Sequence, residues 1–127
     1  MEEQRSCIFL VDDNIVNLNT GKSLLKDKYT VVTIPSGDKL LFLLDKTKPD
    51  LILLDVEMPE MNGYDIIKKL KAKKETNDIP VIFLTGKTDP ENKAFGLSLG
   101  AVDYIFKPFS PQQLIECVEQ HLKPQGE

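Results

Sequence analysis

Five short apolar runs constrain the fold of this chain more than any other feature of its sequence. Residues 7–11, 51–54 and 81–84 are apolar at every position. Strands that are buried on both faces of a parallel sheet have this pattern, whereas strands with one solvated face alternate. Residues 29–34 alternate weakly and residues 103–106 form only a short run. These two runs are therefore predicted to be the edge strands of the sheet.

A segment with helical spacing of apolar residues follows each run. Four of these segments begin with residues that typically cap or start helices: Asn14, Ser36, Asp89 with Pro90, and Ser110 with Pro111. The other segment has its apolar face on residues 66–70. Gly100 follows the fourth segment, in the position where glycine commonly ends a helix.

Five strand–helix units of about 25 residues each predict a parallel sheet with helices on both faces. The predicted fold class is α/β, a doubly wound five-stranded parallel sheet with the flavodoxin-like order 2-1-3-4-5. The 127 residues contain no linker, repeat or low-complexity tract. Because one domain typically takes about 150 residues, we expect a single domain over residues 1–127.

Charge and composition argue against several classes of protein. Sixteen Lys and Arg against twenty Asp and Glu give a net charge of −4, which disfavours direct binding to nucleic acid or to anionic membranes. Two cysteines are too few for a disulfide scaffold. The first six residues are polar and acidic, unlike a signal peptide, and no apolar run reaches the roughly 18 residues of a membrane span. A cytoplasmic location without membrane attachment is expected.

Polar side chains stand at the carboxyl ends of four predicted strands. Asp12 and Asp13 follow the first strand, Asp55 the third, Thr85 the fourth and Lys107 the fifth. Sheets of this class bind ligands beyond the carboxyl ends of their strands, where the strand order reverses. For the order 2-1-3-4-5 that point lies between the first and third strands. These five residues are therefore predicted to share one site.

Three neighbouring carboxylates need a compensating cation, and a set of oxygen ligands selects a hard ion such as Mg²⁺. Lys107 and Thr85 are suited to hold phosphoryl oxygens by charge and by hydrogen bonding. One carboxylate is then available as a nucleophile that forms an aspartyl phosphate. Asp55 is the best candidate because it stands singly after the most hydrophobic strand. Asp12 and Asp13 are predicted to hold the metal.

Taken together, these motifs resemble the receiver domain of two-component response regulators over about residues 6–123. The residues that carry the resemblance are Asp12-Asp13, Asp55 with Met58-Pro59 and Gly63, Thr85-Gly86, and Lys107-Pro108-Phe109. The resemblance implies a signalling phosphoacceptor rather than an enzyme. Asp55 would receive a phosphoryl group from a histidine kinase or a phosphotransfer protein and switch a face that binds a downstream effector.

The resemblance also implies roles for individual residues. It implies Mg²⁺ bound by Asp13, Asp55 and the backbone carbonyl of Glu57, with Asp12 acting partly through water. Thr85 and Tyr104 would form the switch, in which the hydroxyl moves to the phosphoryl oxygens and the aromatic ring follows inward. A cis peptide bond before Pro108 is expected. Residues 99–104 are similar to receivers joined to output domains that handle cyclic di-GMP.

Two other functions remain open. A haloacid dehalogenase-like phosphatase also uses an aspartyl phosphate and Mg²⁺, but its signature requires Asp two residues after the nucleophile, where this chain has Glu57. Its nucleophile also normally ends the first strand rather than the third. A receiver-like module that binds partners without phosphorylation is the second alternative, and the intact set of five site residues argues against it.

Two further pairs of residues are notable. Cys117 and His121 lie four positions apart in a predicted helix, a spacing that can hold a metal. Because only the distant Cys7 offers another such ligand, a small core residue is the favoured interpretation of Cys117. Glu57 and Lys87 each lie two residues beyond a site residue. They are predicted to pair across the mouth of the site and to limit the access of water to a phosphoryl group.

Overall fold

A computed structural model of the chain describes residues 5–59, 61–86 and 90–122. Five parallel strands form one sheet in the order β2-β1-β3-β4-β5, which confirms the predicted fold class. The strands are β1 (Cys7–Val11), β2 (Thr30–Ile34), β3 (Leu51–Asp55), β4 (Val81–Thr85) and β5 (Asp103–Phe106). The two runs predicted as edge strands, β2 and β5, do lie at the edges.

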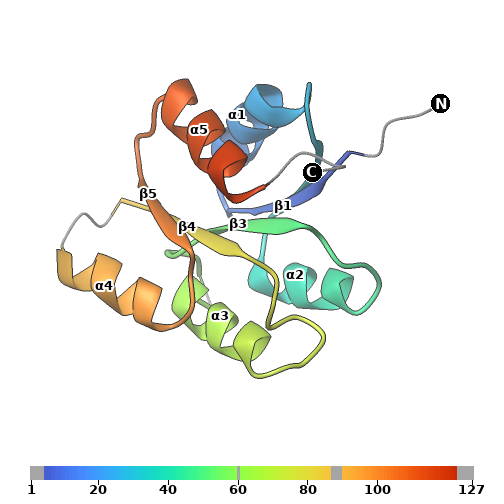
Figure 1. Cartoon of the computed structure of the whole chain (residues 1–127), viewed down its shortest axis with the longest axis vertical. Helices are drawn as coiled ribbons and strands as arrows, with labels where there is room; N and C mark the ends of the chain where they lie inside the picture. Colours follow the sequence, from blue (N-terminus) through green and yellow to red (C-terminus); the bar gives the residue numbers. More distant parts are fainter. Residues whose placement is uncertain (1–4, 60, 87–89, 123–127) are drawn as a thin grey trace.

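Helices cover both faces of this sheet, with α1 and α5 on one side and α2, α3 and α4 on the other (Figure 1). The helices are α1 (Ile15–Leu25), α2 (Gly37–Leu44), α3 (Gly63–Lys71), α4 (Pro90–Ser98) and α5 (Pro111–His121). The two layers explain why three strands are apolar throughout. Successive side chains of a strand point to opposite faces, and here both faces are covered by helices.

The core has two parts, one on each side of the sheet. Phe9, Ile52 and Phe83 belong to the part that packs against α2 and α3. Ile8 and Leu53, one position along their strands from Phe9 and Ile52, belong to the part that packs against α1 and α5. All five side chains are 1% exposed or less. Burying a side chain of this size stabilises the fold by about 1.5–3 kcal/mol. These buried strand residues therefore fix the strands whose ends carry the site.

Helix starts follow the capping residues of the sequence. The side chains of Asn14, Ser36 and Ser110 each accept a hydrogen bond from a backbone N–H in the first turn of α1, α2 and α5. Asn62 caps α3 in the same way. The predicted cap Asp89 lies outside the described residues. Gly100, just beyond α4, has a φ of +113°, a backbone conformation that favours glycine.

Three strand boundaries differ by one residue from those predicted. Asp55 and Thr85 belong to β3 and β4 because each stays in register with the neighbouring strand, opposite Leu84 and Phe106. Tyr29 does not join β2, since its N–H donates to the carbonyl of Leu25 at the end of α1. Asp55 and Thr85 are therefore the last residues of their strands and belong to the sheet.

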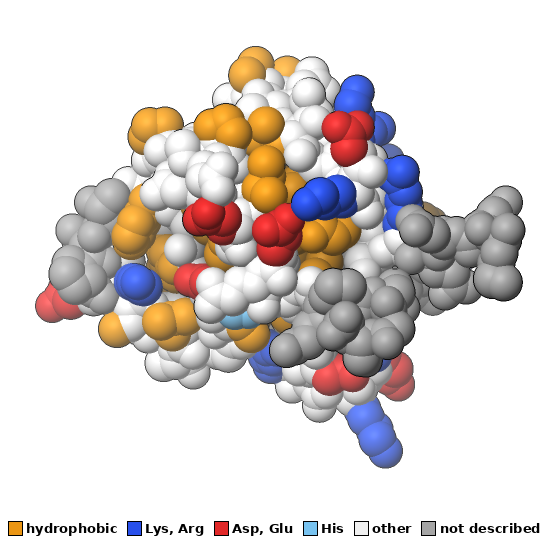
Figure 2. Space-filling view, turned by 45° about the horizontal axis from the view of Figure 1, so that its top comes forward, with side chains coloured by type: hydrophobic (Ala, Val, Ile, Leu, Met, Phe, Trp, Pro, Cys, Tyr) orange, Lys and Arg blue, Asp and Glu red, His pale blue; other side chains and the backbone are white. Residues whose placement is uncertain are grey.

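None of the described helices is long and apolar enough to cross a membrane. Figure 2 shows the face that α1 and α5 form, where acidic side chains lie interspersed with Lys and Arg. No single charge sign dominates this face.

Candidate functional site

Three carboxylates meet at the carboxyl edge of the sheet, where β1 and β3 lie side by side. Asp12 and Asp13 follow β1, and Asp55 is the last residue of β3. One carboxylate oxygen from each residue lies within 4.8 Å of the others. The structure therefore brings together all three predicted carboxylates, at the point where the strand order reverses.

Both carboxylate oxygens of Asp12 accept hydrogen bonds, which fix its side chain. It is 1% exposed, and its Oδ1 accepts from the backbone N–H of Asn14 at 3.0 Å. Its Oδ2 accepts from the side-chain amide of Asn17 at 3.1 Å and from the Lys107 ammonium at 2.8 Å. Asn17, one turn into α1, was not predicted as a site residue. A polar residue on the first turn of the helix after Asp12 was the only signal for it in the sequence.

Asp55 is buried beside a second negative charge. Its Oδ1 accepts from the backbone N–H of Glu57 at 3.1 Å and lies 3.4 Å from Lys107 Nζ. Burial and the neighbouring charge of Asp12 raise the pKa of Asp55 to about 7, although Lys107 and the Glu57 N–H oppose that rise. The site therefore has more negative charge than its own lysine neutralises, which suits it to a divalent cation.

Lys107 joins the two buried carboxylates. Its ammonium lies 2.8 Å from Asp12 and 3.4 Å from Asp55. Partial burial lowers its pKa, but the hydrogen bond that it donates to Asp12 and the charges of both carboxylates outweigh burial, so the pKa is raised overall. The Lys107–Pro108 peptide bond is cis, as expected. The backbone N–H of Lys107 donates to the carbonyl of Thr85 at 2.7 Å, which places the two residues on neighbouring strand ends.

Gly63 allows α3 to begin directly beneath Asp55. A Cβ at this position would lie 2.8 Å from the carbonyl oxygen of Asp55 and 3.0 Å from Cα of Val56. Both are backbone atoms and cannot move aside alone. The glycine of the sequence motif is therefore a packing requirement of the strand that holds Asp55.

We expect Gly63→Ala to lower the free energy of unfolding by about 2 kcal/mol, because the new methyl group forces two backbone segments apart. Gly86→Ala is the matched control, since among the described residues the nearest atom to a Cβ there is a Glu57 carboxylate oxygen at 3.9 Å. That control should stay within about 0.5 kcal/mol of the parent. Urea unfolding of the three proteins measures both values, and equal stability of the two variants would contradict this account of Gly63.

Tyr104 faces inward and packs on the ring of Phe83, with centroids 5.6 Å apart. It is 6% exposed, and its hydroxyl shares a hydrogen bond with the hydroxyl of Tyr64, which in turn donates to the carbonyl of Asn92. Burial and the bond to Tyr64 raise the pKa of Tyr104 above its usual range. Gly96 in α4 leaves the necessary room, since a Cβ there would lie 2.5 Å from the Tyr104 ring.

Tyr64 was not identified from the sequence. Its hydroxyl links the start of α3 to α4 and β5 through Asn92 and Tyr104. Its position directly after Gly63 was the only feature of the sequence that pointed to it. Nothing in the sequence indicated that its hydroxyl would contact β5. Thr85, the other proposed switch residue, is fully buried at the end of β4.

The outer rim of the site is only partly described. Glu57 is exposed, and one of its carboxylate oxygens lies 3.9 Å from where a Cβ of Gly86 would be, so its side chain does extend over the end of β4. Lys87 lies outside the described residues. The proposed pairing of Glu57 with Lys87 stays a prediction.

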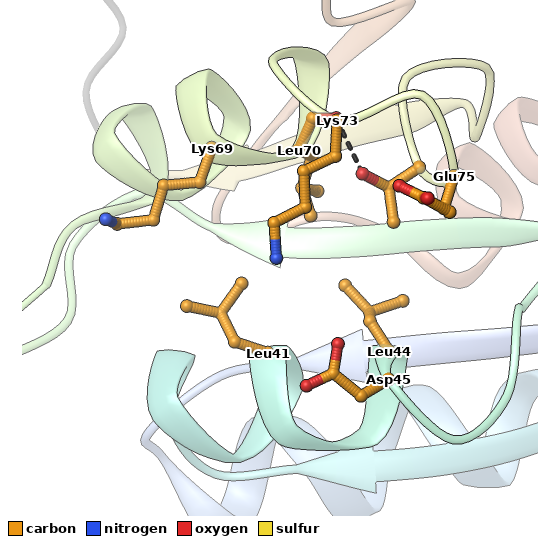
Figure 3. Close-up of a pocket in the computed structure, with 8 residues that line it drawn as sticks. Leu41, Leu44, Asp45, Lys69, Leu70, Lys73 and Glu75 are labelled. Carbon is orange, nitrogen blue, oxygen red and sulfur yellow. Dashed lines mark hydrogen bonds between the residues drawn. The ribbon is translucent and has the colours of Figure 1, made fainter.

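A pocket of about 430 Å³ lies elsewhere, between α2 and the end of α3 (Figure 3). Leu41 and Leu44 face Leu70 across it, while Lys69, Lys73 and Asp45 surround them. The Thr76 hydroxyl donates to the carbonyl of Leu70 at 2.6 Å and is not directed at a ligand. None of the predicted site residues lines this pocket, so it is separate from the carboxylate site.

The order of the strands and the position of the carboxylates define a flavodoxin-like domain with an acidic site at its switch point. Residues 8–119 match the response regulator receiver domain family, and the chain therefore belongs to that family. Receiver domains of this family are signalling phosphoacceptors. The match and the strand order favour this function over a haloacid dehalogenase-like phosphatase.

Individual relatives agree with this assignment. The chain is 44% identical over 124 residues to a Vibrio cholerae protein named a probable cyclic di-GMP phosphodiesterase, covering 97% of this chain and 28% of that protein. It is 47% identical over 87 residues to the response regulator SaeR of Staphylococcus aureus, covering 68% of this chain and 37% of SaeR. It thus spans roughly a third of the length of these two relatives.

Solved structures show the same fold. The chemotaxis response regulator CheY4 of Vibrio cholerae has a TM-score of 0.88 with 31% identity, covering 94% of this chain and 100% of CheY4. The BeF3-activated receiver domain of DrrB has a TM-score of 0.82, also with 31% identity, over 93% of this chain and 97% of DrrB.

Proposed function

We propose that Asp55 is the residue of this receiver domain that accepts the phosphoryl group. The observation that carries the proposal is the position of its carboxylate, buried at the switch point with Asp12 on one side and Lys107 Nζ 3.4 Å away. Asp13 is exposed at the rim, and Asp12 is saturated by hydrogen bonds from Asn14, Asn17 and Lys107. Asp55 is thus the buried carboxylate that has a nearby cation and is not committed to three hydrogen bonds as Asp12 is.

In the transfer, the carboxylate of Asp55 is the nucleophile. An Asp55 carboxylate oxygen attacks phosphorus, the new O–P bond forms, and the bond from phosphorus to the donor breaks, with its electron pair leaving on the donor. Lys107 and Thr85 lie at neighbouring strand ends, and we propose that the ammonium and the hydroxyl hold phosphoryl oxygens. Their charge and hydrogen bonds would act on the phosphoryl group once it is attached to Asp55.

The three carboxylates of the acidic site fit Mg²⁺, since oxygen ligands select a hard divalent cation. We propose that Asp13, Asp55 and the backbone carbonyl of Glu57 hold the ion and that Asp12 contributes partly through water. When bound, Mg²⁺ would neutralise the carboxylates and the phosphoryl oxygens. Asp12 meanwhile holds Lys107 in place through the 2.8 Å contact.

Partners follow from the same proposal. A histidine kinase or a phosphotransfer protein would supply the phosphoryl group, and Thr85 with Tyr104 would pass the change to a face that binds an effector. Tyr104 already packs inward on Phe83 in this structure, so the inward movement of its ring stays a prediction. The named function of the Vibrio cholerae relative, with the similarity at residues 99–104, makes a cyclic di-GMP-handling output domain one candidate effector.

We further propose that residues 1–127 form one domain and act in the cytoplasm.

Acetyl phosphate with Mg²⁺ tests the function directly. We expect intact-mass analysis to show at most one phosphate per chain, and chelation of Mg²⁺ to prevent labelling. Release of many equivalents of phosphate per chain from a phosphomonoester would instead indicate a phosphatase. A complete lack of labelling with folded protein and Mg²⁺ would indicate a receiver that works without phosphorylation.

Mg²⁺ should stabilise the unphosphorylated protein because it relieves repulsion among the three carboxylates. The gain follows RT ln(1 + [Mg²⁺]/Kd) and reaches about 2.7 kcal/mol at one hundred times Kd. Asp13→Ala should need about tenfold more Mg²⁺ for the same rise in melting temperature, since affinity depends on the number of charged ligands. Asp38→Ala, at an exposed acid in α2, is the control. If the melting temperature of the parent does not respond to Mg²⁺, the proposed metal site is wrong.

A further inference from the structure

A second cluster of potential metal ligands lies between β5 and α5, at the opposite end of β5 from Lys107. Asp103 begins β5, and Cys117 and His121 lie one turn apart in α5. One donor atom from each residue lies within 4.8 Å of the other two. The sequence indicated the Cys117–His121 pair alone, and the fold adds a third ligand from a different element.

Cys117 and His121 both approach the same carboxylate oxygen of Asp103. Asp103 Oδ2 lies 3.4 Å from Cys117 Sγ and 3.0 Å from His121 Nε2. Cys117 does pack against the core, as predicted, but it is only partly buried, and its thiol is directed at a carboxylate. A purely packing role does not require an acidic partner for the sulfur.

The two separations from Asp103 Oδ2 are close to those of donors bound to one tetrahedral ion, and Cys117 Sγ and His121 Nε2 lie within 4.8 Å of each other. Bonds of about 2.3 Å to sulfur and about 2.0–2.2 Å to nitrogen and oxygen place tetrahedral donors about 3.3–3.7 Å apart. The observed 3.4 Å and 3.0 Å need changes of only a few tenths of an ångström. All three side chains are partly exposed, so an ion can reach them and water can take a fourth position.

We propose that Asp103, Cys117 and His121 form a binding site for a divalent transition metal of the Zn²⁺ class. A set of one sulfur, one nitrogen and one carboxylate oxygen suits Zn²⁺, whereas the all-oxygen set around Asp55 suits Mg²⁺. On binding, the S–H bond of Cys117 breaks and an S–metal bond forms, and the proton passes to the buffer. No change of oxidation state is involved.

The position of the site predicts an effect on the fold. Asp103 directly precedes Tyr104, and His121 is the last residue of α5. A bound ion would therefore connect the start of β5 to the end of α5 and favour the folded chain over the unfolded one. We expect Zn²⁺ to raise the melting temperature without Mg²⁺ and without phosphorylation. The site is thus independent of the function proposed for Asp55.

Co²⁺ titration of the full chain under a phosphine reductant provides the test, because a thiolate bound to Co²⁺ produces a charge-transfer band that oxygen ligands do not. We expect this band at one Co²⁺ per chain, and we expect Zn²⁺ to abolish it by displacement. Cys117→Ser should lack the band. His121→Ala and Asp103→Asn should require about tenfold or more additional Co²⁺ to reach it.

Cys7→Ser is the matched control, because Cys7 is the other cysteine and lies in β1, away from this cluster. It should keep the band and the Zn²⁺-dependent rise in melting temperature. Asp13→Ala should also keep both, which separates this site from the acidic one. The proposal is overturned if the parent shows no band, if the band survives in Cys117→Ser, or if it disappears in Cys7→Ser. An unchanged affinity of His121→Ala for Co²⁺ would also overturn it, because His121 would then form an ion pair with Asp103 and would not bind the metal.

Discussion

Asp55→Asn should abolish labelling by acetyl phosphate in the presence of Mg²⁺. The amide preserves the shape of the side chain but removes the anionic oxygen that attacks phosphorus. Because Asp12 is committed to three hydrogen bonds and Asp13 is exposed at the rim, neither should replace Asp55 as the acceptor. Intact-mass analysis measures the labelled fraction, and we expect none above background.

Asp38→Asn is the control for this experiment, since it removes the same charge from an exposed position in the first turn of α2. It should label as the parent does. The Asn side chain at position 55 also removes one of two buried acids that repel each other, so the variant should be no less stable than the parent. Label retained in a folded Asp55→Asn protein would contradict the assignment.

Lys107→Ala should have the second-largest effect, on the response rather than on labelling. The ammonium lies 2.8 Å from Asp12 and 3.4 Å from Asp55, so it is ready to contact a phosphoryl group on Asp55 once one is present. That contact favours one of the two conformations of the switch. We expect labelling by acetyl phosphate to persist, whereas phosphorylation-dependent changes in hydrogen exchange at β4 and β5 should be lost.

The same substitution should also destabilise the protein when Mg²⁺ is absent. Without the ammonium, two buried carboxylates face each other, and leaving such a charge uncompensated costs about 3 kcal/mol. Mg²⁺ should restore part of this loss, and Lys39→Ala, at an exposed position of α2, should show neither effect. If labelling and response fall by the same factor, Lys107 acts in the transfer step and not in the switch.

The parts of this structure that follow from local pattern were predictable from sequence. Runs without alternation marked β1, β3 and β4, and the weaker runs marked the edge strands β2 and β5. Strand order then placed Asp12, Asp13 and Asp55 together, because residues far apart in sequence share one edge of a parallel sheet. The site was predictable because its position depends on topology more than on packing detail.

Features that depend on side-chain packing between elements were not predictable. Tyr64 meets Tyr104 only because Gly96 leaves room in α4, a contact that involves three elements. Asp103 meets Cys117 and His121 because the first residue of β5 points toward α5, and a short edge run gave no indication of that direction. Spacing within one helix indicated two of those ligands and could not indicate the third.

The most direct test of the central claim is to locate the phosphoryl group chemically. An aspartyl phosphate is an acyl phosphate, so borohydride reduces it to homoserine, whereas phosphate esters of Ser, Thr or Tyr are not reduced. After labelling with acetyl phosphate and Mg²⁺, reduction and peptide fragmentation should place homoserine at position 55 alone, in proportion to the labelled fraction. Homoserine at position 12 or 13, or labelled protein that yields no homoserine, would contradict the account.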